Sequence, residues 1–148
     1  MSERGPTDVE DLYQATIVDH DRAPRNHGPL AGATHHATVD NPLCGDVITV
    51  QARIGDGAVQ DITFEARGCV LSRAAASIMT TMVRGRSLDA SRQLAAAFEQ
   101  FMQIAPDAAI PEELGELRAF SGVRRFRSRR VCAVLAFRTL MQALDTDT

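Results

Sequence analysis

Residues 47–70 read VITVQARIGDGAVQDITFEARGCV, and this stretch decides the fold. Val47 to Ile54 alternates apolar and polar residues, and so does Val59 to Ala66, which is the period of a half-buried strand. Gly55-Asp56-Gly57 between them has the composition of a tight hairpin turn. Gly68 marks the end of the second strand of this pair. We therefore predict an antiparallel hairpin, followed by a change to helical periodicity from Val70 onward.

A further strand and several helices extend this hairpin in both directions. Thr34 to Asp40 has a strand-forming composition, so the three strands together form an antiparallel meander. Thr7 with Glu10 has the form of a capping box, which predicts that a first helix begins there and stops near Ala23, before Pro24. The element order predicts an α+β fold, in which a small three-stranded antiparallel sheet has its helices packed on one face.

The helices are predicted from apolar residues at helical spacing. Ile110-Pro111-Glu112-Glu113 has proline and acidic residues in a first turn, which predicts a short additional helix. The residues that carry the spacing are Val9, Leu12, Tyr13 and Ile17 in the first helix, Leu71, Ala74, Ala75, Ile78, Met79 and Met82 in the second, Leu94, Phe98, Phe101 and Met102 in the third, and Val131, Val134, Leu135, Leu140, Met141 and Leu144 in the last.

Length and composition narrow the class of protein. The chain has 148 residues, 45% of them hydrophobic, which fits one domain over 1–148 with short disordered tails at 1–6 and 145–148. No apolar run is long enough to span a bilayer, and the N-terminus lacks a signal-peptide core, so we expect a cytoplasmic protein. The formal charge of −3 does not favour nucleic acid. All 16 basic residues are arginine, so this chain has no lysine for Schiff-base chemistry.

The three cysteines stand at or near the ends of the predicted strands and helices. Cys44 lies in the loop before the second strand, Cys69 between the third strand and the long helix, and Cys132 close to the start of the last helix. An odd number of widely spaced cysteines indicates metal or thiol chemistry over a disulfide framework, with three inert core cysteines as the alternative. Residues at the ends of elements converge at one end of a sheet, and helix N-termini stabilise a thiolate.

Asp46 lies two residues after Cys44 and reaches the same centre. Three thiolates and one carboxylate make four ligands, enough for a tetrahedral zinc ion. Among soft thiolate ligands, the carboxylate is the ligand most readily displaced from the metal, and its departure leaves an open coordination position. A structural zinc site more often contains a close C-x₂-C pair, and this sequence has none.

These motifs resemble the SufU/IscU/NifU N-terminal family of iron–sulfur cluster assembly proteins, from Leu12 to about Ala143. The resemblance implies an α+β fold and the metal ligands Cys44, Asp46, Cys69 and Cys132. The residues that carry it are Leu12-Tyr13 with Ile17, Asp19-His20, Pro24-Arg25-Asn26 with Gly28, Asn41-Pro42 with Cys44-Gly45-Asp46, Gly68-Cys69, Ser72, Ser77 with Met79, and Cys132-Ala133 with Leu135.

Two features are similar to the SufU branch of that family. Scaffold members have a histidine just before the last cysteine, where this chain has Val131, and the segment between Cys69 and Cys132 is several helical turns longer than in the scaffolds. Arg129, three residues before Cys132, also matches the branch and is expected to contact the partner. At two positions the chain departs from the branch, which usually has a lysine at Val131 and often a proline at Arg127.

The SufU branch implies bound zinc and a role as persulfide acceptor for a cysteine desulfurase of the SufS type. By this resemblance Cys44 is the nucleophile that attacks the outer sulfur of the partner's persulfide, so the chain acts as a zinc-dependent sulfurtransferase. The alternative is a scaffold on which a [2Fe–2S] cluster is built on the same thiolates and passed on, because those thiolates also ligate iron. A binding module with a purely structural zinc is the third hypothesis. We expect a monomer that works with the desulfurase and with downstream scaffold proteins.

Other residues have simpler interpretations. The arginine run is interpreted as a solvated loop beside the metal site or as a docking patch for an acidic partner, and its lack of interleaved aromatic residues argues against nucleic acid. His20 is expected to be a structural hydrogen-bonding residue, and Met79 and Met82 are expected in the core. The run comprises Arg124, Arg125, Arg127, Arg129 and Arg130.

Overall fold

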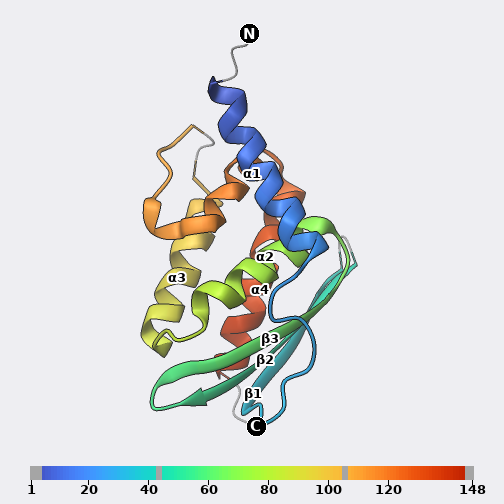
Figure 1. Ribbon diagram of the computed structural model, residues 1–148, viewed down its shortest axis with the longest axis vertical. Helices are drawn as coiled ribbons and strands as arrows, with labels where there is room; N and C mark the ends of the chain where they lie inside the picture. The colour runs from blue at the N-terminus through green and yellow to red at the C-terminus, as the bar shows by residue number, and fades with distance from the viewer. Residues whose placement is uncertain (1–4, 43–44, 105–106, 146–148) are drawn as a thin grey trace.

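The chain folds into a small sheet with a layer of helices packed on one of its faces (Figure 1). The computed structural model describes residues 5–42, 45–104 and 107–145, and for residues 5–9 it describes the backbone alone. The elements are α1 (Gly5–Arg22), β1 (His35–Asn41), β2 (Asp46–Gly55), β3 (Ala58–Arg67), α2 (Val70–Val83), α3 (Leu88–Phe101), a 3₁₀ segment η1 (Glu112–Arg125) and α4 (Arg127–Asp145).

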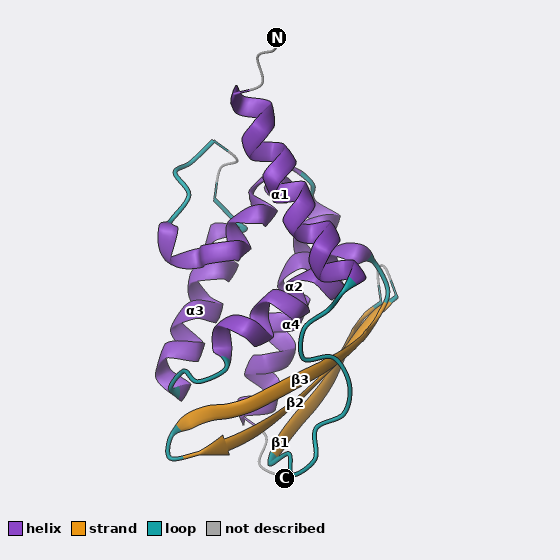
Figure 2. Cartoon of the chain, in the orientation of Figure 1, coloured by secondary structure: helices purple, strands orange, loops and turns teal. Residues whose placement is uncertain are grey.

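The sheet confirms the predicted three-stranded antiparallel meander in the order β1-β2-β3. Asp56 and Gly57 both have positive φ, at 55° and 72°, as the predicted tight turn between β2 and β3 requires. The apolar residues that alternate along β2 and β3 are buried beneath α2 and α4, which cover one face of the sheet (Figure 2). Asn41 pairs with Asp46 where β1 leads into β2, so Asp46 stands at one end of the sheet.

α2 lies at the centre of the helical layer, where it contacts α1, α4 and η1, and most of its residues are buried. Ile78 and Met79 are completely buried and Met82 is half-buried against the core, which confirms the prediction for the methionine stripe. The helix ends near Gly85, whose φ of 86° suits a residue without a side chain. Strand β3 thus runs into a rigid, buried helix through Gly68 and Cys69 alone.

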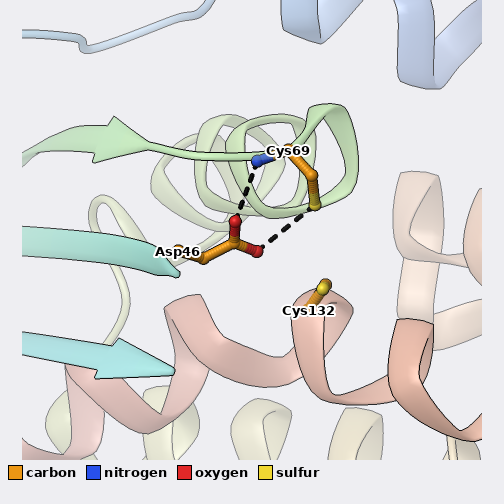
Figure 3. Close-up of side chains that lie close together, drawn as sticks. All are labelled: Asp46, Cys69 and Cys132. Atoms are coloured by element: carbon orange, nitrogen blue, oxygen red, sulfur yellow. Dashed lines mark hydrogen bonds between the residues drawn. The ribbon is translucent and has the colours of Figure 1, made fainter. Parts of the chain in front are cut away.

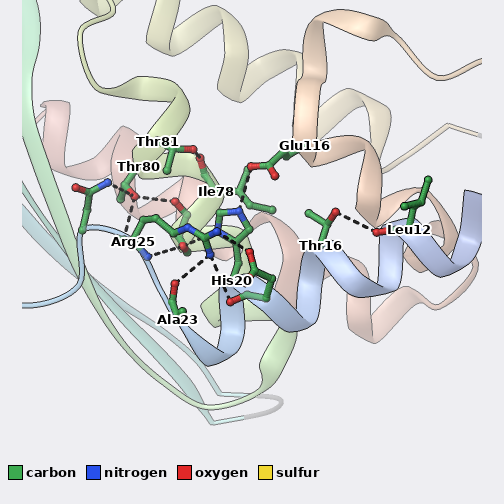
Figure 4. A network of polar contacts seen from close by, with 12 residues as sticks. Leu12, Thr16, His20, Ala23, Arg25, Ile78, Thr80, Thr81 and Glu116 are labelled. Atoms are coloured by element: carbon green, nitrogen blue, oxygen red, sulfur yellow. Dashed lines mark hydrogen bonds and ion pairs between the residues drawn. The ribbon is translucent and has the colours of Figure 1, made fainter.

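A polar network joins α1 to α2 and η1 (Figure 4). The Nδ1 atom of buried His20 lies 2.7 Å from the Ser77 hydroxyl of α2, and its Nε2 atom lies 3.0 Å from a carboxylate oxygen of Glu116 in η1. The backbone N–H of Arg25 donates to the same Ser77 hydroxyl. The structural role predicted for His20 is confirmed, because one side chain connects three elements.

The first helix differs from its prediction. It begins at Gly5, so Thr7 lies inside the first turn and is not the N-cap. Leu12 is 67% exposed, because α1 contacts the rest of the protein through the side that carries Ile17 and His20. The predicted tails, 1–6 and 145–148, fall mostly outside the described residues, and their described members are helical.

The segment before Cys132 also differs from its prediction. The short helix expected after Ile110 is a 3₁₀ segment that reaches Arg125 and breaks at Gly115, where φ is 55° and ψ is −130°. The arginine run is not a loop, since it spans the end of η1 and the first turn of α4. Arg124 is only 3% exposed, with its guanidinium carbon 4.4 Å from the centre of the Phe101 ring. No helix in the described part of the chain is both long and apolar enough to cross a bilayer.

Candidate metal centre

Three of the four predicted ligands meet at one end of the sheet (Figure 3). Asp46 is the first residue of β2, Cys69 is the N-cap of α2, and Cys132 lies in the second turn of α4. Their ligand atoms, one carboxylate oxygen and two sulfurs, all lie within 4.8 Å of one another. Residues separated by as many as 86 positions in the sequence (132 minus 46) therefore form one cluster.

The carboxylate of Asp46 is fixed by the residues that begin α2. Asp46 is 1% exposed, and its Oδ1 accepts a hydrogen bond of 2.9 Å from the backbone N–H of Cys69. Its Oδ2 lies 3.3 Å from the Cys69 sulfur. A buried carboxylate is costly without such partners, so the start of α2 is adapted to hold a negative charge.

Ser72 is a site residue to which the sequence did not assign a role. Its hydroxyl is completely buried and donates to Oδ2 of Asp46, and it also lies 3.5 Å from the Cys69 sulfur and 3.4 Å from the Cys132 carbonyl oxygen. The available signal was its spacing, because a residue three positions after the N-cap shares that residue's side of the helix. Ser72 thereby touches all three elements that carry the ligands.

Gly68 permits the close approach between β2 and the start of α2. Its φ is 138°, and a Cβ atom at this position would overlap Oδ1 of Asp46 and stand 2.9 Å from the Cα atom of Asp46. Arg73 reinforces the bend, because its guanidinium donates to the Gly68 carbonyl over 3.3 Å and to Asp21 of α1 over 2.6 Å. The loop that presents Cys69 is thus held from both sides.

The structure describes two of the three cysteines. Cys44 lies outside the described residues, between Pro42 and Gly45, which are described. Cys132 was expected at an element end, but it lies inside α4 and is 6% exposed, because α4 begins five residues earlier, at Arg127. Cys69 and Cys132 do not form a disulfide with each other.

A pocket of about 370 Å³ opens onto the two described thiols. It is lined by Cys69, Val70, Leu71, Ser128, Arg129 and Cys132, so a molecule entering it reaches both sulfurs. Arg129 is exposed at its rim, with its guanidinium carbon 5.2 Å from the centre of the Phe126 ring. The residue expected to contact a partner therefore stands beside the thiols, on the surface of the protein.

The donors suit a metal ion such as zinc. Zinc in proteins is bound by cysteine sulfur, histidine nitrogen and carboxylate oxygen, usually through four ligands in a tetrahedron. Asp46, Cys69 and Cys132 provide three such donors within 4.8 Å of one another. The packing of Gly68 against Asp46 shows that this close approach is built into the fold.

Comparison with known proteins shows the family of this chain. The family model described as the NifU-like N terminal domain matches residues 12–133. The chain belongs to this family. Among relatives of the NifU-like group, the zinc-dependent sulfurtransferase SufU of Bacillus subtilis is 34% identical over 94% of this chain and 93% of its own length. The iron–sulfur cluster assembly scaffold protein IscU of Streptococcus pyogenes is 36% identical over 90% of this chain and 82% of its own.

Solved structures extend the likeness to the fold. The N-terminal part of a nitrogen-fixing NifU-like protein from Brucella abortus superposes with a TM-score of 0.81 at 27% identity, covering 93% of this chain and 94% of that one. The predicted SufU/IscU/NifU relationship and the predicted α+β fold are both confirmed. This NifU-like protein is thus of the IscU/SufU type of iron–sulfur cluster assembly proteins.

Proposed function

We propose that the protein binds zinc through Cys44, Asp46, Cys69 and Cys132 and accepts sulfur from a cysteine desulfurase of the SufS type, whose turnover it increases. The observation that carries the proposal is the convergence of one carboxylate oxygen and two thiols within 4.8 Å beside a surface pocket. A relative with 34% identity is named a zinc-dependent sulfurtransferase, which supports the same assignment.

The cysteine ligands and Asp46 have different proposed roles in the chemistry. When bound, zinc would hold the cysteine sulfurs as thiolates, the form in which they react. Asp46 accepts hydrogen bonds from the Cys69 N–H and the Ser72 hydroxyl. These two groups would hold its carboxylate in place whenever it is not bound to the metal. All four proposed ligands belong to one chain, so a monomer would be sufficient to form the site.

Cys44 is the proposed sulfur acceptor. Its thiolate attacks the terminal sulfur of the partner's persulfide, so that a new bond forms between the Cys44 sulfur and that terminal sulfur. The sulfur–sulfur bond of the partner breaks at the same time, and its electron pair leaves on the partner's cysteine thiolate. Atoms and electrons balance with no outside oxidant, and the persulfide now belongs to Cys44. Arg129, at the pocket rim, is the proposed contact to the partner.

The second candidate function is a scaffold that carries a [2Fe–2S] cluster and transfers it to other proteins. It is favoured by the relatives named as IscU scaffold proteins and by the ability of the same thiolates to bind iron. We rank it second because Val131 stands where the scaffold branch has a histidine, and because η1 and its flanks lengthen the segment before Cys132.

Desulfurase turnover with the wild-type protein and with Cys44→Ser tests the proposal. We expect the wild type to increase turnover strongly and Cys44→Ser to abolish the increase. Cys69→Ser is the matched variant, since it removes a proposed ligand of the same kind but keeps the proposed nucleophile. Mass spectrometry should then find a persulfide on Cys44 in the wild type and, at a lower level, in Cys69→Ser.

Two results would contradict this function. One is full stimulation of the desulfurase by Cys44→Ser. The other is a reconstituted cluster that passes to an apo-protein while the wild type has no effect on desulfurase turnover, which would establish the scaffold function.

A further inference from the structure

A second, larger pocket lies between α1, η1 and the first turn of α4. Its volume is about 660 Å³, and α1 runs alongside η1 at this place (Figure 1). Its apolar lining comes from different elements, so the pocket exists only in the folded chain. These residues are Tyr13 and Ile17 of α1, Leu71 of α2, Val123 of η1, and Phe126, which is 51% exposed. We call this pocket the arginine groove, after the residues described next.

Three guanidinium groups line the arginine groove. Arg124 is buried against Phe101. Its positive charge is attracted by the carboxylate of Asp107, which also lines the groove. Arg125 and Arg129 are exposed, and no carboxylate in the described part of the chain forms an ion pair with either of them. Two positive charges beside an apolar surface are therefore open to an incoming ligand.

The arginine groove is adjacent to the pocket of the two thiols. Leu71 and Arg129 line both of them, and Arg129 lies against Phe126 between the two openings. Val70, which follows Cys69 directly, is 44% exposed and lines the thiol pocket. A chain segment that lies in the groove would therefore lie next to the pocket of the thiols.

We propose that the arginine groove is the docking site for a segment of the desulfurase, in which an apolar side chain is flanked by carboxylates. The apolar side chain fits the lining formed by Ile17 and Phe126, and the carboxylates meet Arg125 and Arg129. This rests on the proposed function, because the desulfurase is the partner that carries the sulfur. Nucleic acid fits less well, since the exposed aromatic surface is limited and the net charge of the chain is −3.

Binding of the desulfurase from the same genome to the zinc-loaded, full-length protein tests the docking site, with no cysteine substrate present. We expect Arg125→Glu to weaken binding by about tenfold or more, because like charges then face each other across the interface. We also expect the affinity of the wild type to fall with salt more steeply than that of the variant.

Arg53→Glu is the matched control, because it makes the same charge change seven residues along β2 from Asp46. At the rise of an extended strand that is about 24 Å away from the metal centre. Its ion pair with Asp61 is long, at 3.8 Å, and half-exposed, and Arg84 also pairs with Asp61, so the variant should fold and bind the desulfurase like the wild type.

A photo-crosslinking amino acid in place of Phe126 identifies the occupant directly. We expect it to capture a desulfurase segment in which an apolar residue stands next to Asp or Glu, and the same probe at Arg53 should capture none. Wild-type affinity in Arg125→Glu would overturn the proposal. So would a crosslink to a second copy of this chain, or salt-sensitive binding of a random oligonucleotide that Arg125→Glu abolishes.

The two proposals fail in different ways. If the desulfurase transfers sulfur to Cys44 while Arg125→Glu binds normally, the docking site is wrong and the proposed function stands. If the wild type neither binds the desulfurase nor gains a persulfide, the proposed function is wrong and the docking site falls with it.

Discussion

Asp46 is held in place by two neighbouring groups of the protein itself. The Cys69 N–H and the Ser72 hydroxyl both donate to its carboxylate, and Gly68 leaves room for that contact. These contacts belong to the folded chain, so the donor set is preorganised before any ion arrives. Preorganisation raises affinity because less conformational freedom is lost on binding. Single substitutions here should therefore change both the stability of the protein and its affinity for metal.

Gly68→Ala should damage the site by direct overlap with Asp46. Gly28→Ala is the control, because Gly28 also has a strongly positive φ, of 122°, but a Cβ there would meet no atom within 4 Å. We expect Gly28→Ala to lower the free energy of unfolding by about 1–3 kcal/mol through backbone strain alone. Gly68→Ala should lower it further and weaken zinc binding, as measured by urea denaturation and competition with a zinc chelator. Equal effects of the two variants would show that the contact with Asp46 is unimportant.

Ser72→Ala should leave the buried carboxylate with one donor fewer. We expect the free energy of unfolding of the metal-free protein to fall by about 1–3 kcal/mol, the usual cost of a buried polar group that loses its partner. Ser91→Ala removes an equally buried hydroxyl that bonds only the backbone carbonyl of Ser87, so it controls for the loss of the hydroxyl itself. If the two variants match in stability and in zinc affinity, Ser72 has no special role at the site.

His20 connects α1, α2 and η1 at a distance from the proposed ligands. His20→Ala removes contacts to Ser77 and Glu116 and leaves a cavity, so we expect the free energy of unfolding to fall by about 2–4 kcal/mol. The exposed His36→Ala should change it by less than about 0.5 kcal/mol. Chemical denaturation measures both values. A His20→Ala variant as stable as the wild type would contradict the structural role of this residue.

The elements were predicted best where local signals agree. The hairpin, its turn and the position of Cys69 followed from alternation and from glycines, because those signals act within a few residues. Leu12 was misjudged because periodicity finds an apolar face but does not show whether another element covers it. Arg124 was assigned to a solvated run, yet it is buried on Phe101, a contact between α3 and η1 that no local pattern encodes. The role of Ser72 likewise depends on β2 and α4, which are distant in the sequence.

At the scale of the whole molecule, the metal centre joins β2, α2 and α4 at one end of the sheet. An ion bound there would add a further link between elements that already meet through packing and through the hydrogen bonds of Asp46 and Ser72. Binding to the folded state stabilises a protein by an amount set by the ratio of free ligand to its dissociation constant, about 4 kcal/mol at a ratio of about 1,000. We therefore expect zinc removal by a chelator to lower the Tm and zinc addition to restore it. Cys69→Ser should show a much smaller shift, and an unchanged Tm in the wild type would contradict a bound ion.

X-ray absorption at the zinc edge of the protein, as purified, tests the central claim most directly. The account predicts one zinc ion per chain with three sulfur neighbours, from Cys44, Cys69 and Cys132, at about 2.3 Å and one oxygen neighbour from Asp46 at about 2.0–2.2 Å. Asp46→Ala should lose the oxygen and keep the three sulfurs. Absence of zinc, or a first shell without three sulfurs and an oxygen, would contradict the account, and iron in its place would favour the scaffold function.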